Sequence, residues 1–150
     1  MEAMKIMLVD DEERLLQTTK KLFNKMGIEV ITTTNGEEAV DLINKENIHV
    51  VFMDIKMPGI DGMETLRKIK KENPLVEVII LTGHATMESA VEGLKLGAMD
   101  YLIKPLSMKN FLEKAEDAFE KVKRQKQKIL KACRTELPVA GRDTENTERR

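Results

Sequence analysis

The sequence is poor in cysteine, in aromatic residues and in long apolar runs. Of its 150 residues, one is Cys, one is Tyr, four are Phe and none is Trp. A single cysteine, Cys133, cannot form a disulfide within the chain, which favours a reducing cytoplasm. So few aromatic side chains argue against a platform for stacking nucleic-acid bases. The longest apolar runs reach about five residues, far below the ~20 of a membrane span, and no secretory signal pattern is present.

The net charge of −1 conceals an uneven distribution of charged residues. Residues 1–120 contain 15 Lys/Arg and 22 Asp/Glu, a balance of −7, whereas residues 121–150 contain 10 and 4, a balance of +6. Such asymmetry can mark a tail or a surface for a partner. We interpret the basic end as a solvated helix end, where cations face the negative end of the helix dipole, in preference to a nucleic-acid site.

Short apolar runs alternate with amphipathic helical patterns along the chain. Strands are expected over residues 5–9, 28–33, 49–53, 76–81 and 101–103. A helical pattern follows each of them, the last and longest over about 108–133. This alternation predicts an α/β fold in which helices cover both faces of a parallel sheet. Residues 138–150 are polar and without pattern, and we expect a disordered tail there.

Polar residues follow the predicted strands at the points where those strands end. Asp10 and Asp11 follow the first strand, Asp54 the third, Thr82 the fourth and Lys104 the fifth. In open α/β sheets, ligands bind beyond the carboxyl ends of the strands, so these five residues are expected to converge. Clustered carboxylates repel one another unless a cation is present, and hard oxygen ligands suit Mg²⁺. Carboxylates also serve as nucleophiles in aspartyl-phosphate formation.

Each of these residues also has a purely structural explanation. The acid pair could cap a helix, Asp54 could end a strand, and Thr82 and Lys104 could lie in ordinary turns. The combination is much more specific than any member. It fits Mg²⁺-assisted phosphorylation of an aspartate, with a lysine and a hydroxyl available to the phosphoryl oxygens.

Four segments together resemble the receiver domain of two-component response regulators, a chemotaxis-regulator-like domain. They are LVDDEE (8–13), MDIKMPGIDG (53–62), ILTGHAT (80–86) and DYLIKP (100–105). The resemblance covers about residues 4–122 and implies a flavodoxin-like, doubly wound sheet of five parallel strands in the order 2-1-3-4-5. ILTGHAT is also similar to receivers of sigma-54-dependent activators and related transcription regulators.

The resemblance implies a role for each residue of the predicted site. Asp54 is the expected phosphoacceptor. Asp10, Asp11, Asp54 and the backbone carbonyl of Lys56 are the expected Mg²⁺ ligands, and Lys104 is expected to bind a phosphoryl oxygen.

The same resemblance implies a switch around this site. Thr82 is the expected switch hydroxyl and Tyr101 the switch aromatic, whose alternative role is that of a half-buried strand residue. Lys56 and His84 flank the phosphate in the family, and we expect them to tune its lifetime. The Lys104–Pro105 peptide bond is expected to be cis.

The function implied is a phosphorylation-activated signalling switch rather than a dedicated enzyme. Its partners would be a sensor histidine kinase or phosphotransfer protein and a downstream output protein or domain. The face formed by the fourth helix, fifth strand and fifth helix would change on phosphorylation. The alternatives are a phosphate-independent pseudo-receiver that binds proteins, an aspartyl phosphatase, which Lys56 disfavours because that position would want a second acid, and a DNA-binding basic helix.

The expected organisation is a receiver at 1–122, a helical extension or linker at 123–137 and the tail at 138–150. Residues at alternating spacings of three and four form a heptad seam along the last helix, with Lys126 as its polar interruption. The seam comprises Leu112, Ala115, Phe119, Val122, Lys126, Ile129 and Cys133. It suggests a homodimer through this helix, the alternatives being a frayed extension or a dimer through the fourth-helix face.

Overall fold

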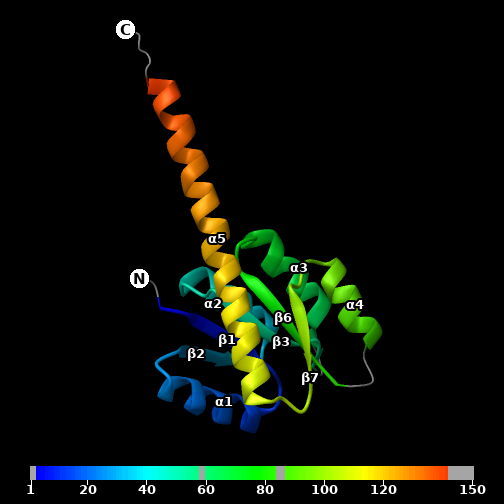
Figure 1. Cartoon of the computed structure of the whole chain (residues 1–150). Coiled ribbons are helices and arrows are strands. Elements are labelled where there is room, and N and C mark those ends of the chain that lie inside the picture. Colours follow the sequence, from blue (N-terminus) through cyan, green and yellow to red (C-terminus); the bar gives the residue numbers. More distant parts are fainter. Residues whose placement is uncertain (1–2, 58–59, 84–86, 142–150) are drawn as a thin grey trace.

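A five-stranded parallel sheet forms the centre of the chain (Figure 1). The structure, a computed structural model, describes residues 3–57, 60–83 and 87–141. The sheet strands are β1 (Lys5–Val9), β2 (Glu29–Thr33), β3 (Val50–Asp54), β6 (Glu77–Thr82) and β7 (Asp100–Ile103). Their order is β2-β1-β3-β6-β7, which confirms the predicted flavodoxin-like topology.

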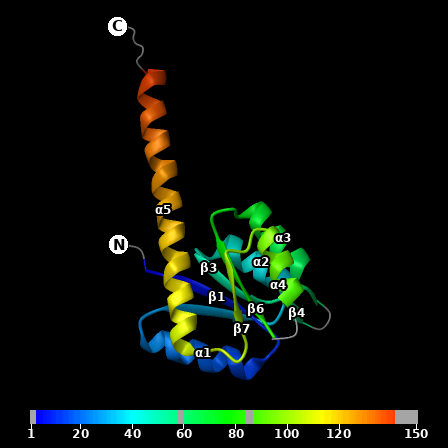
Figure 2. The ribbon, with the colours of Figure 1, turned by 45° about the vertical axis from the view of Figure 1, so that its right-hand side comes forward.

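Helices α1 and α5 cover one face of the sheet, and α2, α3 and α4 cover the other (Figures 1 and 2). Their bounds are α1 (Glu13–Lys25), α2 (Gly36–Lys45), α3 (Gly62–Glu72), α4 (Met87–Lys95) and α5 (Met108–Gly141). None of the helices among the described residues has both the length and the apolar character to span a bilayer.

The two faces have separate cores because successive strand residues point to opposite sides. In β1, Ile6 and Leu8 join the core under α1 and α5, whereas Met7 and Val9 join the core under α2 and α3. β3 is buried along its whole length. Strands buried on both faces have almost continuous apolar sequences, and this is why the sequence located them within one or two residues.

Two features differ from the sequence prediction. The segment after β3 contains a two-stranded antiparallel hairpin, β4 (Lys56–Met57) and β5 (Ile60–Asp61), where we expected only a loop. The last helix continues to Gly141 rather than ending near Cys133, so the boundary placed at residue 138 falls within α5. The rest of the expected tail, from residue 142, lies outside the described residues.

The buried stripe of α5 anchors this helix to the sheet. It consists of Phe111, Ala115, Ala118 and Val122, all at most 2% exposed. The seam predicted from the sequence shares Ala115 and Val122 with this stripe but places Leu112 and Phe119, which are only partly buried, in place of Phe111 and Ala118.

Phe111 joins three elements in one aromatic cluster. Its ring centroid lies 4.2 Å from that of Phe52 on β3 and 5.1 Å from that of Phe23 on α1. The contact with Phe23 is edge-to-face, a favourable geometry for two rings. We therefore regard Phe111 as the main apolar anchor of α5.

Replacing this anchor should destabilise the whole domain. Phe111→Ala leaves a cavity between α1, β3 and α5 and should lower the free energy of unfolding by about 3–5 kcal/mol. Urea denaturation measures the change. Leu130→Ala, at a position 55% exposed on the same helix, is the control and should change stability by less than about 0.5 kcal/mol. Equal effects of the two substitutions would contradict the anchoring role.

Candidate functional site

The polar residues predicted to converge do lie together at the carboxyl edge of the sheet. Asp54 ends β3 and Thr82 ends β6, whereas Asp10 directly follows β1 and Lys104 directly follows β7. The parallel register brings these ends to one level, with Val9 beside Met53 and Asp54 beside Leu81. Asp10, Asp54 and Thr82 are buried, and Asp11 is exposed.

Lys104 is the central cation of this edge. Its Nζ donates to Asp54 Oδ2 at 3.0 Å and to Glu12 Oε1 at 2.9 Å, and it lies 2.8 Å from Asp10 Oδ2. Its backbone N–H donates to the Thr82 carbonyl at 2.8 Å, and this bond ties the lysine to the end of β6. Burial opposes the ammonium form, but the interactions of the ammonium with the carboxylates of Asp10, Glu12 and Asp54 outweigh burial and raise the pKa of Lys104. Lys104 therefore stays charged.

Asp10 is the most deeply buried member of the site, with no exposed surface. Its Oδ1 accepts a hydrogen bond from the Glu12 backbone N–H at 3.0 Å. Burial raises the pKa of Asp10, and this effect exceeds the opposing effects of Lys104 and of the Glu12 N–H. A buried carboxylate of this kind is stabilised by any further cation that reaches it.

The carboxylates of Asp10, Asp11 and Asp54 fit a metal ion. One oxygen from each lies within 4.8 Å of the other two. Asp10 Oδ2 is buried and lies 2.8 Å from the Lys104 ammonium. An all-oxygen set with a buried oxygen that still has capacity suits Mg²⁺, which takes a few carboxylates and keeps several waters.

The predicted switch residues have different surroundings. Thr82 is buried, and its hydroxyl donates to the Gly83 carbonyl at 3.0 Å. Tyr101 lies on β7, is partly buried and packs against the core on the α2–α3 face. The Lys104–Pro105 peptide bond is cis, as expected.

The described part of the chain includes little of the two residues that we expect to tune the lifetime of the phosphoryl group. Lys56 lies in β4, two residues after Asp54, but its side chain is outside the described part of the chain. His84 falls entirely outside the described residues. Their roles, and that of the Lys56 carbonyl, therefore stay predictions.

Glu12 is the member of the site that the sequence analysis missed. It was interpreted only as one of the acids that open the first helix. It precedes α1 as its N-cap residue, makes no side-chain cap, and instead accepts from Lys104. The sequence signal for Glu12 was its position two residues after Asp10. This signal is weak, because acids are common at the starts of helices.

Gly62 holds the loop of Asp54 close to α3. A Cβ on Gly62 would lie 2.6 Å from the Ile55 Cα and 2.8 Å from the Ile55 carbonyl oxygen. Since Ile55 directly follows Asp54, only glycine allows this close approach.

Comparison with known proteins identifies the family. The family model described as "Response regulator receiver domain" matches residues 6–116, well over half of the chain. The chain belongs to the response regulator receiver family. The site described above lies within the matched segment, and the predicted resemblance is confirmed.

The relatives of this receiver include a transcriptional regulatory protein and a phosphotransferase. It is 38% identical over 113 residues to transcriptional regulatory protein ZraR of Escherichia coli K12, a match that covers 73% of this chain and 26% of ZraR. It is 32% identical over 117 residues to sporulation initiation phosphotransferase F of Bacillus subtilis, which covers 78% of this chain and 91% of that protein. The chain thus spans about a quarter of ZraR and most of the phosphotransferase.

Solved structures agree with this assignment. A response regulator receiver domain protein from Clostridium thermocellum is 37% identical, with a TM-score of 0.76 over 81% of this chain and 98% of that one. NtrX from Brucella abortus is 31% identical, with a TM-score of 0.78 over 84% of this chain and 29% of NtrX. ZraR and NtrX agree with the expected resemblance to receivers of transcription regulators.

Removing the central cation should make the receiver depend more strongly on a metal ion. Lys104→Met leaves the carboxylates of Asp10 and Asp54 without their ammonium partner, so stability in the absence of Mg²⁺ should fall by about 2–4 kcal/mol. Mg²⁺ should then raise the melting temperature of the variant more than that of the wild type. Lys68→Met, an exposed lysine on α3, is the control. Equal Mg²⁺ responses in all three proteins would contradict this role of Lys104.

Proposed function

We propose that this receiver is a phosphorylation-activated signalling switch that accepts a phosphoryl group from a phosphohistidine onto Asp54. The observation that carries the proposal is the position of the Asp54 carboxylate. It ends the central strand β3, lies 3.0 Å from the Lys104 ammonium and shares a possible metal site with Asp10 and Asp11. Phosphoryl transfer needs mainly positioning and positive charge, and this edge of the sheet supplies both.

The reaction forms one bond and breaks one. An Asp54 carboxylate oxygen bonds to phosphorus, while the phosphorus–nitrogen bond of the donor phosphohistidine breaks and its imidazole leaves with the electron pair. Lys104 holds a phosphoryl oxygen, for which it exchanges one of its present carboxylate contacts. Asp10, Asp11, Asp54 and the Lys56 carbonyl would hold Mg²⁺, which supplies further positive charge when bound.

The response to phosphorylation is assigned to Thr82 and Tyr101. The Thr82 hydroxyl, which now donates to Gly83, can turn to donate to a phosphoryl oxygen. Tyr101 then turns further inward, toward the face of the sheet that α4 covers. As a result, the surface formed by α4, β7 and α5 changes. This is a population shift between two packings, biased by a local charge.

The partners follow from this chemistry. A sensor histidine kinase or phosphotransfer protein supplies the phosphohistidine, and an output protein or domain recognises the changed face. We place the reaction in the cytoplasm, where the single free Cys133 stays reduced. The receiver catalyses only its own phosphorylation and dephosphorylation.

A phosphate-independent pseudo-receiver is the competing function. The aspartates, the Thr82 hydroxyl and Lys104 occur together at this edge, and their combination favours the phosphorylated switch. Burying carboxylates is costly, and a module that only binds proteins does not need them here.

Acetyl phosphate tests the proposed acceptor. The full chain incubated with acetyl phosphate and Mg²⁺ should gain one alkali-labile phosphoryl group by intact mass, and omission of Mg²⁺ should prevent it. Asp54→Asn should gain none, because an amide is a poor nucleophile toward phosphorus.

The matched control is Asp41→Asn, an exposed acid on α2 away from the site, which should be phosphorylated like the wild type. A phosphoryl adduct on the Asp54→Asn variant would contradict the assignment of the acceptor. Absence of both an adduct and Mg²⁺ binding in the wild type would favour the pseudo-receiver.

Lys56 and His84 should set the lifetime of the phosphoryl group. Lys56→Ala and His84→Ala should both be phosphorylated, since neither side chain is the acceptor or the central cation. Their rates of phosphate loss, followed by intact mass after removal of acetyl phosphate, should differ from that of the wild type. Three identical decay rates would refute this tuning role.

A further inference from the structure

Glu12 occupies one of the contacts of the Lys104 ammonium. Its Oε1 lies 2.9 Å from Lys104 Nζ, and the same Nζ lies 2.8 Å from Asp10 Oδ2 and 3.0 Å from Asp54 Oδ2. Three carboxylates therefore surround an ammonium group that has three N–H donors. A phosphoryl oxygen can bind Lys104 only if one of these carboxylates gives way.

The three carboxylates differ in how readily they can leave Lys104. The side chain of Asp10 has no exposed surface and that of Asp54 is 11% exposed, whereas that of Glu12 is 60% exposed. Water would solvate a released Glu12 carboxylate, while a released Asp10 carboxylate would stay buried without its cation, which is costly. Asp54 is the proposed acceptor and must stay in place for the reaction. Glu12 is therefore the contact that can be exchanged.

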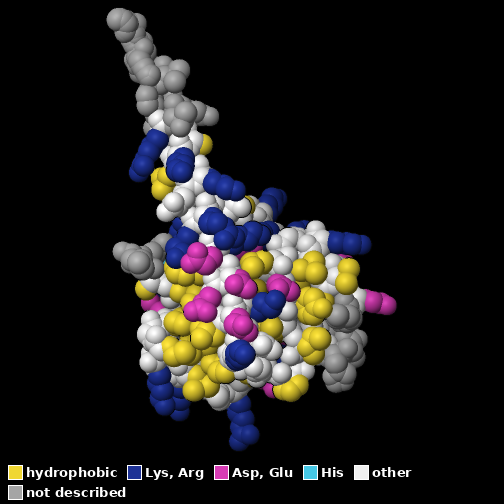
Figure 3. Space-filling model, viewed as in Figure 1, with side chains coloured by type: hydrophobic (Ala, Val, Ile, Leu, Met, Phe, Trp, Pro, Cys, Tyr) yellow, Lys and Arg dark blue, Asp and Glu magenta, His cyan; other side chains and the backbone are white. Residues whose placement is uncertain are grey.

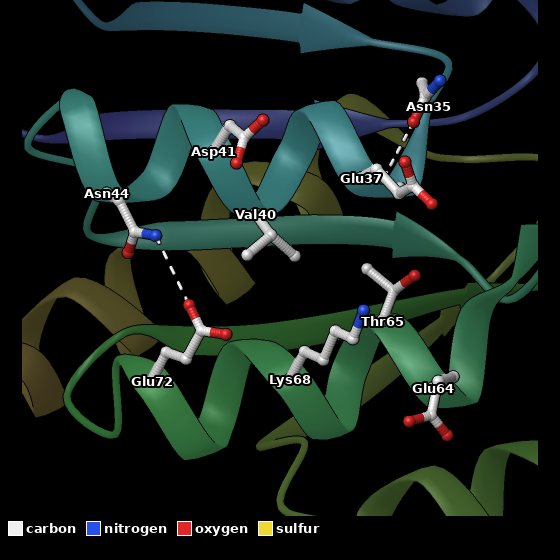
Figure 4. A pocket seen from close by; sticks show the side chains of 10 residues that line it. Asn35, Glu37, Val40, Asp41, Asn44, Glu64, Thr65, Lys68 and Glu72 are labelled. Carbon is white, nitrogen blue, oxygen red and sulfur yellow. Dashed lines mark hydrogen bonds between the residues drawn. The ribbon is translucent and has the colours of Figure 1, made fainter.

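The backbone holds Glu12 in place independently of its side chain. Its N–H donates to Asp10 Oδ1 at 3.0 Å, and its carbonyl accepts from the Leu16 N–H at 3.1 Å. Glu12 is the N-cap residue of α1, but its side chain makes no capping hydrogen bond. The N-cap of α2 shows the usual arrangement, in which the Asn35 side chain accepts from the Glu37 N–H at 2.8 Å (Figure 4). The Glu12 side chain can therefore move without disturbing the start of α1.

The carboxyl edge of the sheet carries an excess of negative charge. Asp11 adds a fourth carboxylate, since one of its oxygens lies within 4.8 Å of oxygens of Asp10 and Asp54. Lys and Arg side chains gather on the projecting part of α5 (Figure 3), which leaves the sheet at its amino edge and so does not offset this charge. A phosphoryl donor is itself negatively charged, and Glu12 adds to the repulsion that the donor meets.

We propose that Glu12 is a positioning residue that holds Lys104 in the unphosphorylated receiver and releases it to the phosphoryl group. This inference rests on the proposed function and names the carboxylate contact that Lys104 exchanges. No covalent bond to Glu12 forms or breaks. One hydrogen bond of the ammonium passes from the Glu12 carboxylate to a phosphoryl oxygen. Because the contact must first be broken, Glu12 slows phosphorylation and favours the unphosphorylated state.

The rate of phosphorylation by acetyl phosphate tests this role on the full chain. Glu12→Gln keeps the length of the side chain but removes its charge. In acetyl phosphate and Mg²⁺ this variant should gain its phosphoryl group about threefold to fivefold faster than the wild type, as followed by intact mass. Beryllofluoride, a non-covalent mimic of the phosphoryl group on a carboxylate, should bind the variant more tightly by a similar factor in calorimetry.

Glu12→Asp separates the contact from the charge. Asp keeps the negative charge, but its side chain is one methylene shorter and favours capping α1, which draws it away from Lys104. This variant should also react faster than the wild type, by about twofold or more, if the contact itself slows the reaction. Glu13→Gln is the matched control, because Glu13 is an exposed acid in the first turn of α1, and this variant should react like the wild type.

A Glu12→Gln variant that reacts at the wild-type rate would overturn the proposal. Equal gains from Glu12→Gln and Glu13→Gln would also overturn it. The same holds if Glu12→Asp matches the wild type while Glu12→Gln is faster, because charge alone would then explain the effect. A wild type that gains no phosphoryl group and binds no beryllofluoride would instead refute the proposed function on which this inference rests.

Discussion

The contact of one lysine with three carboxylates governs the carboxyl edge of this sheet. Lys104 directly follows the last strand, Asp54 ends the third strand, and Asp10 and Glu12 come from the loop after the first. The parallel topology forces these acids together, and their mutual repulsion would be costly without a cation. The contact therefore holds the loops after β1, β3 and β7 in one arrangement and joins distant parts of the sequence.

The long helix α5 connects this edge to the opposite one. It begins after the Lys104–Pro105 bond, crosses the sheet through Phe111, Ala115, Ala118 and Val122, and leaves at the amino edge. The same helix that follows the loop of Lys104 therefore also covers one face of the sheet along its length.

The sequence predicted the sheet well because its strands are short and largely apolar, and the three central strands, β1, β3 and β6, are buried on both faces. The site was predicted from strand-end chemistry, and the resemblance to receivers supplied the individual roles. The buried stripe of α5 was harder to predict from the sequence. Phe111 and Leu112 are adjacent apolar residues about 100° apart on the helix, and the same holds for Ala118 and Phe119. Only packing decides which of each pair faces the sheet.

Other features had no local signal at all. The β4–β5 hairpin has two residues in each strand, too few to show an alternating pattern. The contact of Glu12 with Lys104 spans 92 positions and depends on the topology rather than on neighbouring residues. Such long-range polar contacts become visible only when the strands are placed side by side.

The most direct test of the central claim is to locate the phosphoryl group chemically. Borohydride reduces an aspartyl phosphate to homoserine, so reduction of the phosphorylated chain followed by peptide mass analysis identifies the modified residue. We expect homoserine at position 54 and nowhere else. Reduction at Asp10 or Asp11, or a phosphoryl group on a hydroxyl or imidazole, would contradict the account of this site.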